Sequence, residues 1–124
     1  MAGSWTRFCR SADLDVADSV IDVRFADGRR QRVAVEEHGR EYLLRSFVVR
    51  QAVVASMPDL PVRIWERNRS TALAGFRING RGQLVGEAWV PRAGLRAKEF
   101  RLYVRTVAAE CDRLEYVLTG RDVE

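Results

Sequence analysis

The sequence contains few of the residues that carry catalysis or hold metal ions. It has one histidine, His38, and two cysteines, Cys9 and Cys111. A nucleophilic site needs a base beside its serine or cysteine, and His38 falls in an expected turn. The two cysteines are far apart and lack the ligand spacing of a zinc site, and no HExxH motif is present. We therefore expect no enzymatic activity, no metal and no cofactor.

Long apolar runs are also missing. No stretch approaches the ~18 apolar residues that a membrane span needs, and residues 1–7 lead into no segment typical of a signal peptide. We expect a cytoplasmic protein without membrane contact, in which both cysteines are reduced. Cys9 and Cys111 fall on apolar helical stripes, where a free cysteine behaves as a small buried hydrophobe.

The remaining composition is typical of one soluble domain, residues 1–124. Hydrophobic residues make up 47% and charged residues 31% of the chain, and this length suffices for one core. Three prolines and nine glycines are too few for a disordered or collagen-like chain.

Positive charge is concentrated in one segment. The formal net charge is +4, and lysine supplies only Lys98, so the bases are almost all arginine. Residues 1–62 are balanced, and so are residues 82–124, whereas the 63–81 segment carries five arginines against Glu66. These are Arg63, Arg67, Arg69, Arg77 and Arg81. Such a patch can attract nucleic acid, acidic lipid or an acidic protein segment, although a solvated arginine-rich face gives the same pattern.

Periodicity and turn residues predict a helix, three strands, a short helix, two strands and a long helix. The first helix begins at Ser4 and ends at the acidic stretch 13–18. The expected later segments are strands at 21–25, 33–35 and 42–49, a helix at 61–69, strands at 73–78 and 83–90, and a helix at 95–118. Alternation at 62–64 also permits a strand in place of the short helix.

The long helix has the strongest periodic signal. Apolar residues recur at spacings of three and four from Phe100 to Leu118, and Gly120 is the expected C-terminal cap. Its charged face contains like-charge neighbours, including Arg101 and Arg105, so we expect that face to be solvated. The predicted fold class is α+β, with an antiparallel sheet of about five strands and helices on one of its faces.

Aromatic residues near arginines are the candidate binding residues, because protein interfaces and single-stranded nucleic-acid sites both favour this combination. The expected protein-binding residues are Trp65, Val85, Trp89, Arg63 and Arg67. The basic patch of Arg69, Arg77 and Arg81 is the alternative, nucleic-acid-binding surface. The short helix is expected to point Trp65 inward. Two alternatives follow for Trp65 and Trp89, which can fill the chain's own core or lie in an interface between two copies.

Residues 67–122 combine several motifs in a fixed order. Asn68 ends a short helix, a strand closes in Phe76-x-Ile78, and a Val90-Pro91 pair ends the next strand. The long helix then carries Ala-x-x-Cys-Asp-Arg-Leu at 108–114 and ends in Gly-x-Asp. This order resembles the family that joins type III secretion chaperones and YbjN proteins, and the N-terminal half is similar in plan.

The resemblance implies an α-βββ-α-ββ-α chaperone-like fold, often homodimeric, that binds other proteins and catalyses nothing. Secretion chaperones tend to be acidic, whereas this chain is basic. We therefore expect a small bacterial chaperone-like or adaptor protein that binds a protein partner as a homodimer. Nucleic-acid binding through the 63–81 patch is the alternative.

Overall fold

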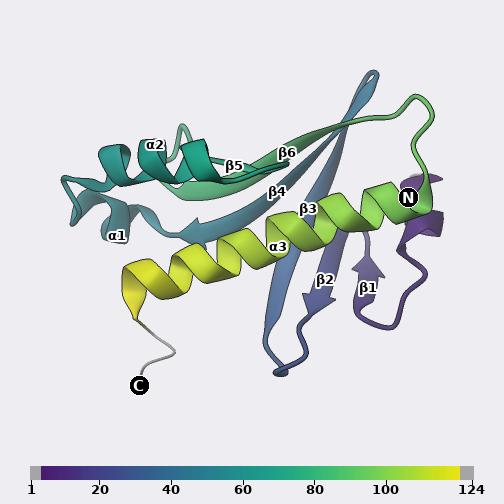
Figure 1. The fold of residues 1–124 in the computed structure, drawn as a ribbon, viewed down its shortest axis with the longest axis horizontal. Coiled ribbons are helices and arrows are strands. Elements are labelled where there is room, and N and C mark those ends of the chain that lie inside the picture. Colours follow the sequence, from purple (N-terminus) through teal and green to yellow (C-terminus); the bar gives the residue numbers. More distant parts are fainter. Residues whose placement is uncertain (1–3, 121–124) are drawn as a thin grey trace.

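The protein is built around one antiparallel sheet, with a long helix across one face (Figure 1). A computed structural model describes residues 4–120. Its elements are η1 (Ser4–Cys9), β1 (Leu14–Ala17), β2 (Val20–Arg24), β3 (Arg30–His38), β4 (Glu41–Val49), α1 (Gln51–Ala55), α2 (Leu60–Ser70), β5 (Gly75–Ile78), β6 (Leu84–Pro91) and α3 (Ala97–Thr119). The α+β class and the long C-terminal helix are as predicted.

Six strands form the sheet, in the order β1-β2-β3-β4-β6-β5. Strands β1 to β4 follow one another as a meander, because their connections are too short for a crossover helix. The chain then passes through α1 and α2 to reach β5 at the far edge, and β6 returns between β5 and β4. Gly28 and Gly82 have φ of 91° and 75° in the turns between β2 and β3 and between β5 and β6, a backbone region that glycine enters without strain.

The additional strand is β1, which lies in the acidic stretch expected only to end the first helix. Leu14 is its one buried residue, and Asp15, Val16 and Ala17 are exposed. Its backbone pairs with β2 from Leu14↔Val23 to Ala17↔Val20. The strand is therefore held by backbone pairing rather than by an apolar pattern, so alternation in the sequence does not reveal it. The preceding segment is a 3₁₀-helix of six residues.

Residues 50–70 form two helices. The short helix α1 was not predicted. Residues 61–69, for which the sequence permitted a helix or a strand, belong to helix α2, with Pro61 in its first turn. The expected inward position of Trp65 is wrong, because 61% of this side chain is exposed. Leu60 and Ile64, four residues apart, fill the inward face instead, and Trp65 lies ~100° further around the helix axis.

Helix α3 supplies the centre of the core. Its buried residues are Phe100, Val104, Val107, Ala108, Cys111 and Leu114, and it ends at Gly120, whose φ is 64°. The Phe100 ring contacts the rings of Trp5 and Tyr42 at centroid distances of 6.1 and 5.8 Å. Both cysteines are buried, as predicted. Burial raises the pKa of Cys9 to about 11 and that of Cys111 to about 12.

The charged face of α3 is more structured than expected. Arg101 donates to the Phe8 carbonyl at 3.0 Å, and the Arg105 Nε atom lies 2.8 Å from a carboxylate oxygen of Asp13. Asp112 pairs with Arg29 of the β2–β3 hairpin. These partners come from residues far apart in the sequence, so helical spacing alone does not predict them. They offset the repulsion between Arg101 and Arg105.

Helix α3 and strand β6 meet most closely at Gly86. A Cβ atom at this position would overlap the Cys111 Sγ atom and lie 3.1 Å from the Phe76 ring. The missing side chain is therefore what lets the helix approach the strand.

We predict that Gly86→Ala lowers the free energy of unfolding by about 1–3 kcal/mol, because it overfills this contact. Adding Cys111→Ala should recover part of that loss, a coupling that a double-mutant cycle in urea measures. Gly80→Ala is the matched control, since a Cβ there meets nothing within 4 Å. Equal effects at positions 80 and 86 would contradict the prediction.

The Asp13–Arg105 pair makes stability depend on pH. Hydrogen bonds from Arg105 hold the pKa of Asp13 well below its usual range. Ionised Asp13 therefore stabilises the fold at pH above about 4, and this contribution declines as pH falls toward the lowered pKa. We expect Asp13→Asn to destabilise the protein more at pH 7 than at pH near 3, as measured by urea unfolding. Asp59→Asn is the control, and the same loss for Asp13→Asn at both pH values would refute the assignment.

Candidate functional site

The sheet has one face without a helix, here called the open face. Cross-strand pairs on it include Phe47 opposite Val85, Arg45 opposite Glu87 and Leu43 opposite Trp89. Side chains at these positions alternate with those that face α3. Phe47 and Trp89 are exposed on this face, whereas Leu43 and Val85 are buried among their neighbours.

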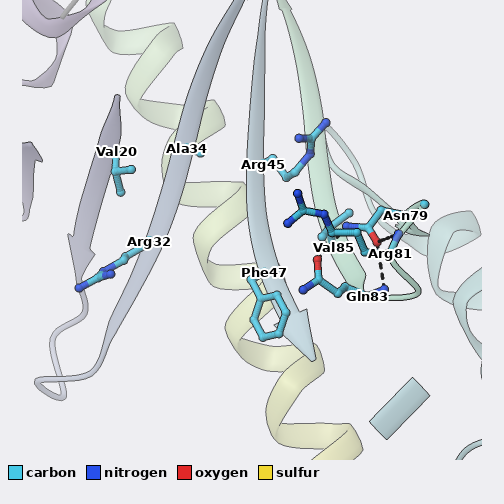
Figure 2. Close-up of a pocket in the computed structure, with 10 residues that line it drawn as sticks. Val20, Arg32, Ala34, Arg45, Phe47, Asn79, Arg81, Gln83 and Val85 are labelled. Carbon is cyan, nitrogen blue, oxygen red and sulfur yellow. Dashed lines mark hydrogen bonds between the residues drawn. The ribbon is translucent and has the colours of Figure 1, made fainter. Parts of the chain in front are cut away.

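A groove of about 660 Å³ runs across the open face (Figure 2). It is lined by Val20, Arg32, Ala34, Arg45, Phe47, Asn79, Gly80, Arg81, Gln83 and Val85. Phe47 is 47% exposed, whereas Val85 is buried beside it. The Asn79 side chain accepts hydrogen bonds from the backbone N–H groups of Arg81 and Gln83, at 2.9 and 3.0 Å, and so fixes the turn at one end of the groove.

Ion pairs neutralise part of the charge on this face. The Glu87 carboxylate receives Arg45 Nε at 2.6 Å and Arg77 Nε at 2.7 Å, and Arg45 also reaches Glu36 at 2.9 Å. Burial opposes ionisation of Glu87, but the hydrogen bonds from Arg77 and Arg45 outweigh it and lower the pKa of Glu87. Arg45 and Arg77 therefore have little free charge to offer a ligand.

Helix α2 presents a second exposed surface, here called the α2 surface and made of Val62, Trp65 and Arg69. Val62 and Trp65 are each 61% exposed, and the Arg69 guanidinium lies 5.0 Å from the centroid of a Trp65 ring. An arginine beside an exposed tryptophan is typical of protein interfaces.

The residues singled out from the sequence lie on several surfaces. Trp65 and Arg69 belong to the α2 surface, and the half-buried Arg63 is on the same helix. Arg67 lines a different groove together with residues of α3. Val85, Arg77 and Arg81 are at the open face, and Trp89 lies on that face beside His38, at a ring distance of 5.3 Å.

Sequence reasoning missed Phe47 and Arg32 in the groove. Phe47 lies in a stretch so rich in apolar residues that its position on the open face is not evident from pattern. Its register against Val85 is what places it there.

No three His, Cys, Asp or Glu side chains of residues 4–120 are grouped as metal ligands. His38 is exposed and lies 2.9 Å from Glu36. Helices long and apolar enough to cross a membrane are absent from the described part of the chain.

Asn68 fastens α2 to the outer edge of the sheet. Its side-chain amide donates to the Phe76 carbonyl at 2.9 Å and accepts from the Phe76 N–H at 2.8 Å. The amide thus takes the place of a neighbouring strand at β5, and α2 shields this edge.

Comparison with solved structures establishes the fold. No protein-family model matches the chain, and no curated protein matches it. A chain of the heterodimeric ExoU-SpcU complex, from the type III secretion system of Pseudomonas aeruginosa, aligns with a TM-score of 0.63 at 12% identity, over 97% of this chain and 99% of that one.

Two further solved structures show the same arrangement. The Yersinia pestis type III secretion chaperone SycH, in complex with a stable fragment of YscM2, aligns with a TM-score of 0.55 at 6% identity, over 90% of this chain and 99% of that one. YbjN from E. coli also gives 0.55, at 14% identity, over 89% of this chain and 81% of that one. The fold expected from the sequence motifs is confirmed.

We predict that Asn68→Ala destabilises the protein by about 1–3 kcal/mol, because it leaves the Phe76 backbone groups without partners. Amide hydrogen exchange at Phe76 should also become faster. Ser70→Ala is the control, since its hydroxyl bonds only within α2. Unchanged exchange at Phe76 in the Asn68→Ala variant would contradict this role.

Proposed function

We propose that the chain is a non-catalytic protein-binding module, a small bacterial chaperone-like or adaptor protein of the cytoplasm that acts as a homodimer. The observation that carries the proposal is the exposure of Val62 and Trp65 on α2, at 61% each, beside a core that is complete without them. The fold supports it, because the ExoU-SpcU and SycH structures are complexes of two proteins.

The α2 surface suits an interface between two copies. A twofold axis brings the same patch of both copies together, so each Trp65 would be covered by apolar surface of the other α2. The cation–π contact with Arg69 holds the exposed ring in place. A stable dimer would bury about 1,200–2,000 Å² in total, so residues around α2 would contribute as well.

Nucleic-acid binding is the less well supported alternative. Its basis is the net charge of the 63–81 segment. Arg77 is held by Glu87, Arg67 lies in a groove beside α3, and Arg69 lies over Trp65. The charges are thus spread over several surfaces rather than lined up along one path for a phosphate backbone.

Light scattering after size exclusion tests the dimer. The chain has a mass of 14.1 kDa, so we expect twice that value at micromolar concentration. Trp65→Glu should return the mass to that of one chain without changing the circular dichroism spectrum. Val117→Glu, which alters a 48% exposed residue of α3, is the matched control and should stay dimeric.

A wild-type mass near 14.1 kDa at every concentration would remove the dimer from the proposal. The nucleic-acid alternative predicts tight binding of a single-stranded oligonucleotide that falls steeply with salt. Such binding, abolished by Arg69→Gln and Arg81→Gln, would overturn the protein-binding proposal.

A further inference from the structure

An exposed aromatic side chain lies inside the sheet rather than at its edge. Phe47 belongs to β4, which lies between β3 and β6, but the pairing with β3 ends at Arg45, and Phe47 is 47% exposed. A β-bulge between Phe47 and Val49 interrupts the pairing with β6. Gln31 donates to the Phe47 carbonyl at 2.8 Å, which satisfies this backbone group at the irregularity. The ring is therefore held on a firmly bonded backbone.

The floor of the groove around Phe47 is aliphatic. Val20 and Ala34 lie opposite each other on β2 and β3, and Val85 faces Phe47 from β6. In Figure 2, Val20 and Arg32 line one side and Val85 and Arg81 the other, with Phe47 between them. A chain crossing the groove could thus bury an apolar side chain at its centre.

The charge of the groove has one sign. Its lining includes Arg32, Arg45 and Arg81 and no acidic residue. Arg45 is neutralised by Glu36 and Glu87, which lie outside the lining. Within residues 4–120 the guanidinium groups of Arg32 and Arg81 have no hydrogen-bond or ion-pair partner. Asp22, opposite Arg32 on β2, is paired with Arg30 at 2.9 Å.

We infer that the groove binds an extended segment of the partner protein in which acidic residues flank an apolar side chain. The apolar side chain packs on Phe47, Val20 and Ala34, and carboxylates on either side of it pair with Arg32 and Arg81. Charge complementarity carries this assignment, since two unpaired arginines border an apolar floor that has no carboxylate. The inference rests on the proposed protein-binding function and adds the place and chemistry of the contact.

Other occupants fit the groove less well. A second copy would present the same groove lining, which has no carboxylate to pair with the unpaired Arg32 and Arg81. Single-stranded nucleic acid uses successive aromatic platforms and many phosphate contacts. The groove offers one aromatic ring and two free charges.

The test is selection of peptides from a random phage-displayed library on the immobilised wild-type chain, with counter-selection on Phe47→Ser. We expect enriched sequences with Asp or Glu on both sides of a Leu, Phe or Trp residue. Synthetic peptides of these sequences are then titrated by fluorescence anisotropy. Phe47→Ser should weaken their binding by at least about tenfold, and Arg32→Gln and Arg81→Gln by about threefold to tenfold each.

Arg113→Gln is the matched control and should leave the affinity unchanged, because Arg113 is an exposed arginine of α3, on the other side of the sheet. The glutamine variants alter exposed side chains, so they keep the test valid even if Phe47→Ser does not fold. Circular dichroism and light scattering confirm that each variant keeps its fold and mass.

No enrichment of acidic–apolar sequences would overturn the inference. Selected peptides that bind the groove variants as tightly as the wild type would also overturn it, while supporting protein binding at another surface. If Arg32→Gln or Arg81→Gln changes the molecular mass measured by light scattering, the groove is an interface between copies of the chain. That result would also overturn the inference. The dimer test on Trp65 stands apart from these results, so the two proposals can fail separately.

Discussion

The close approach of α3 to β6 determines which face of the sheet is covered by a helix and which face stays open. At Gly86 the strand has no side chain, and the Cys111 thiol occupies that space. The helix can therefore lie near enough to bury the part of its apolar stripe from Phe100 to Leu114 against one face of the sheet, whereas Val117 is exposed. One helix covers one face, and the opposite face remains without a helix.

The two surfaces left available differ in character. The α2 surface is apolar and flanked by arginine, which suits association with a like surface on a second copy. The open face combines an aliphatic groove with unpaired arginines, which suits a segment of opposite charge. Asn68 holds α2 at the edge of β5, and Leu60 and Ile64 fill the inward face of the helix, so Trp65 lies on its exposed side.

The folded structure changes which arginines of the chain are paired with carboxylates and which are grouped together. The 63–81 segment accounts for the whole net charge of +4, and on sequence alone it is either a candidate binding patch or a solvated face. In the fold, Arg77 is held by Glu87, and the unpaired Arg81 is grouped instead with Arg32 from a segment of zero net charge. The local charge at the groove depends on which carboxylates the strand register brings near each arginine.

Elements whose signals are local could be predicted from the sequence. The long helix, the α+β class and the burial of both cysteines follow from residue spacing within single segments. The resemblance in residues 67–122 added the chaperone-like arrangement. The remaining features depend on contacts between segments. Strand β1 depends on pairing with β2, and the outward position of Trp65 depends on which face of α2 meets the sheet. Phe47 and Arg32 share a groove because β3 and β4 are adjacent strands of the sheet, and no single segment contains that information.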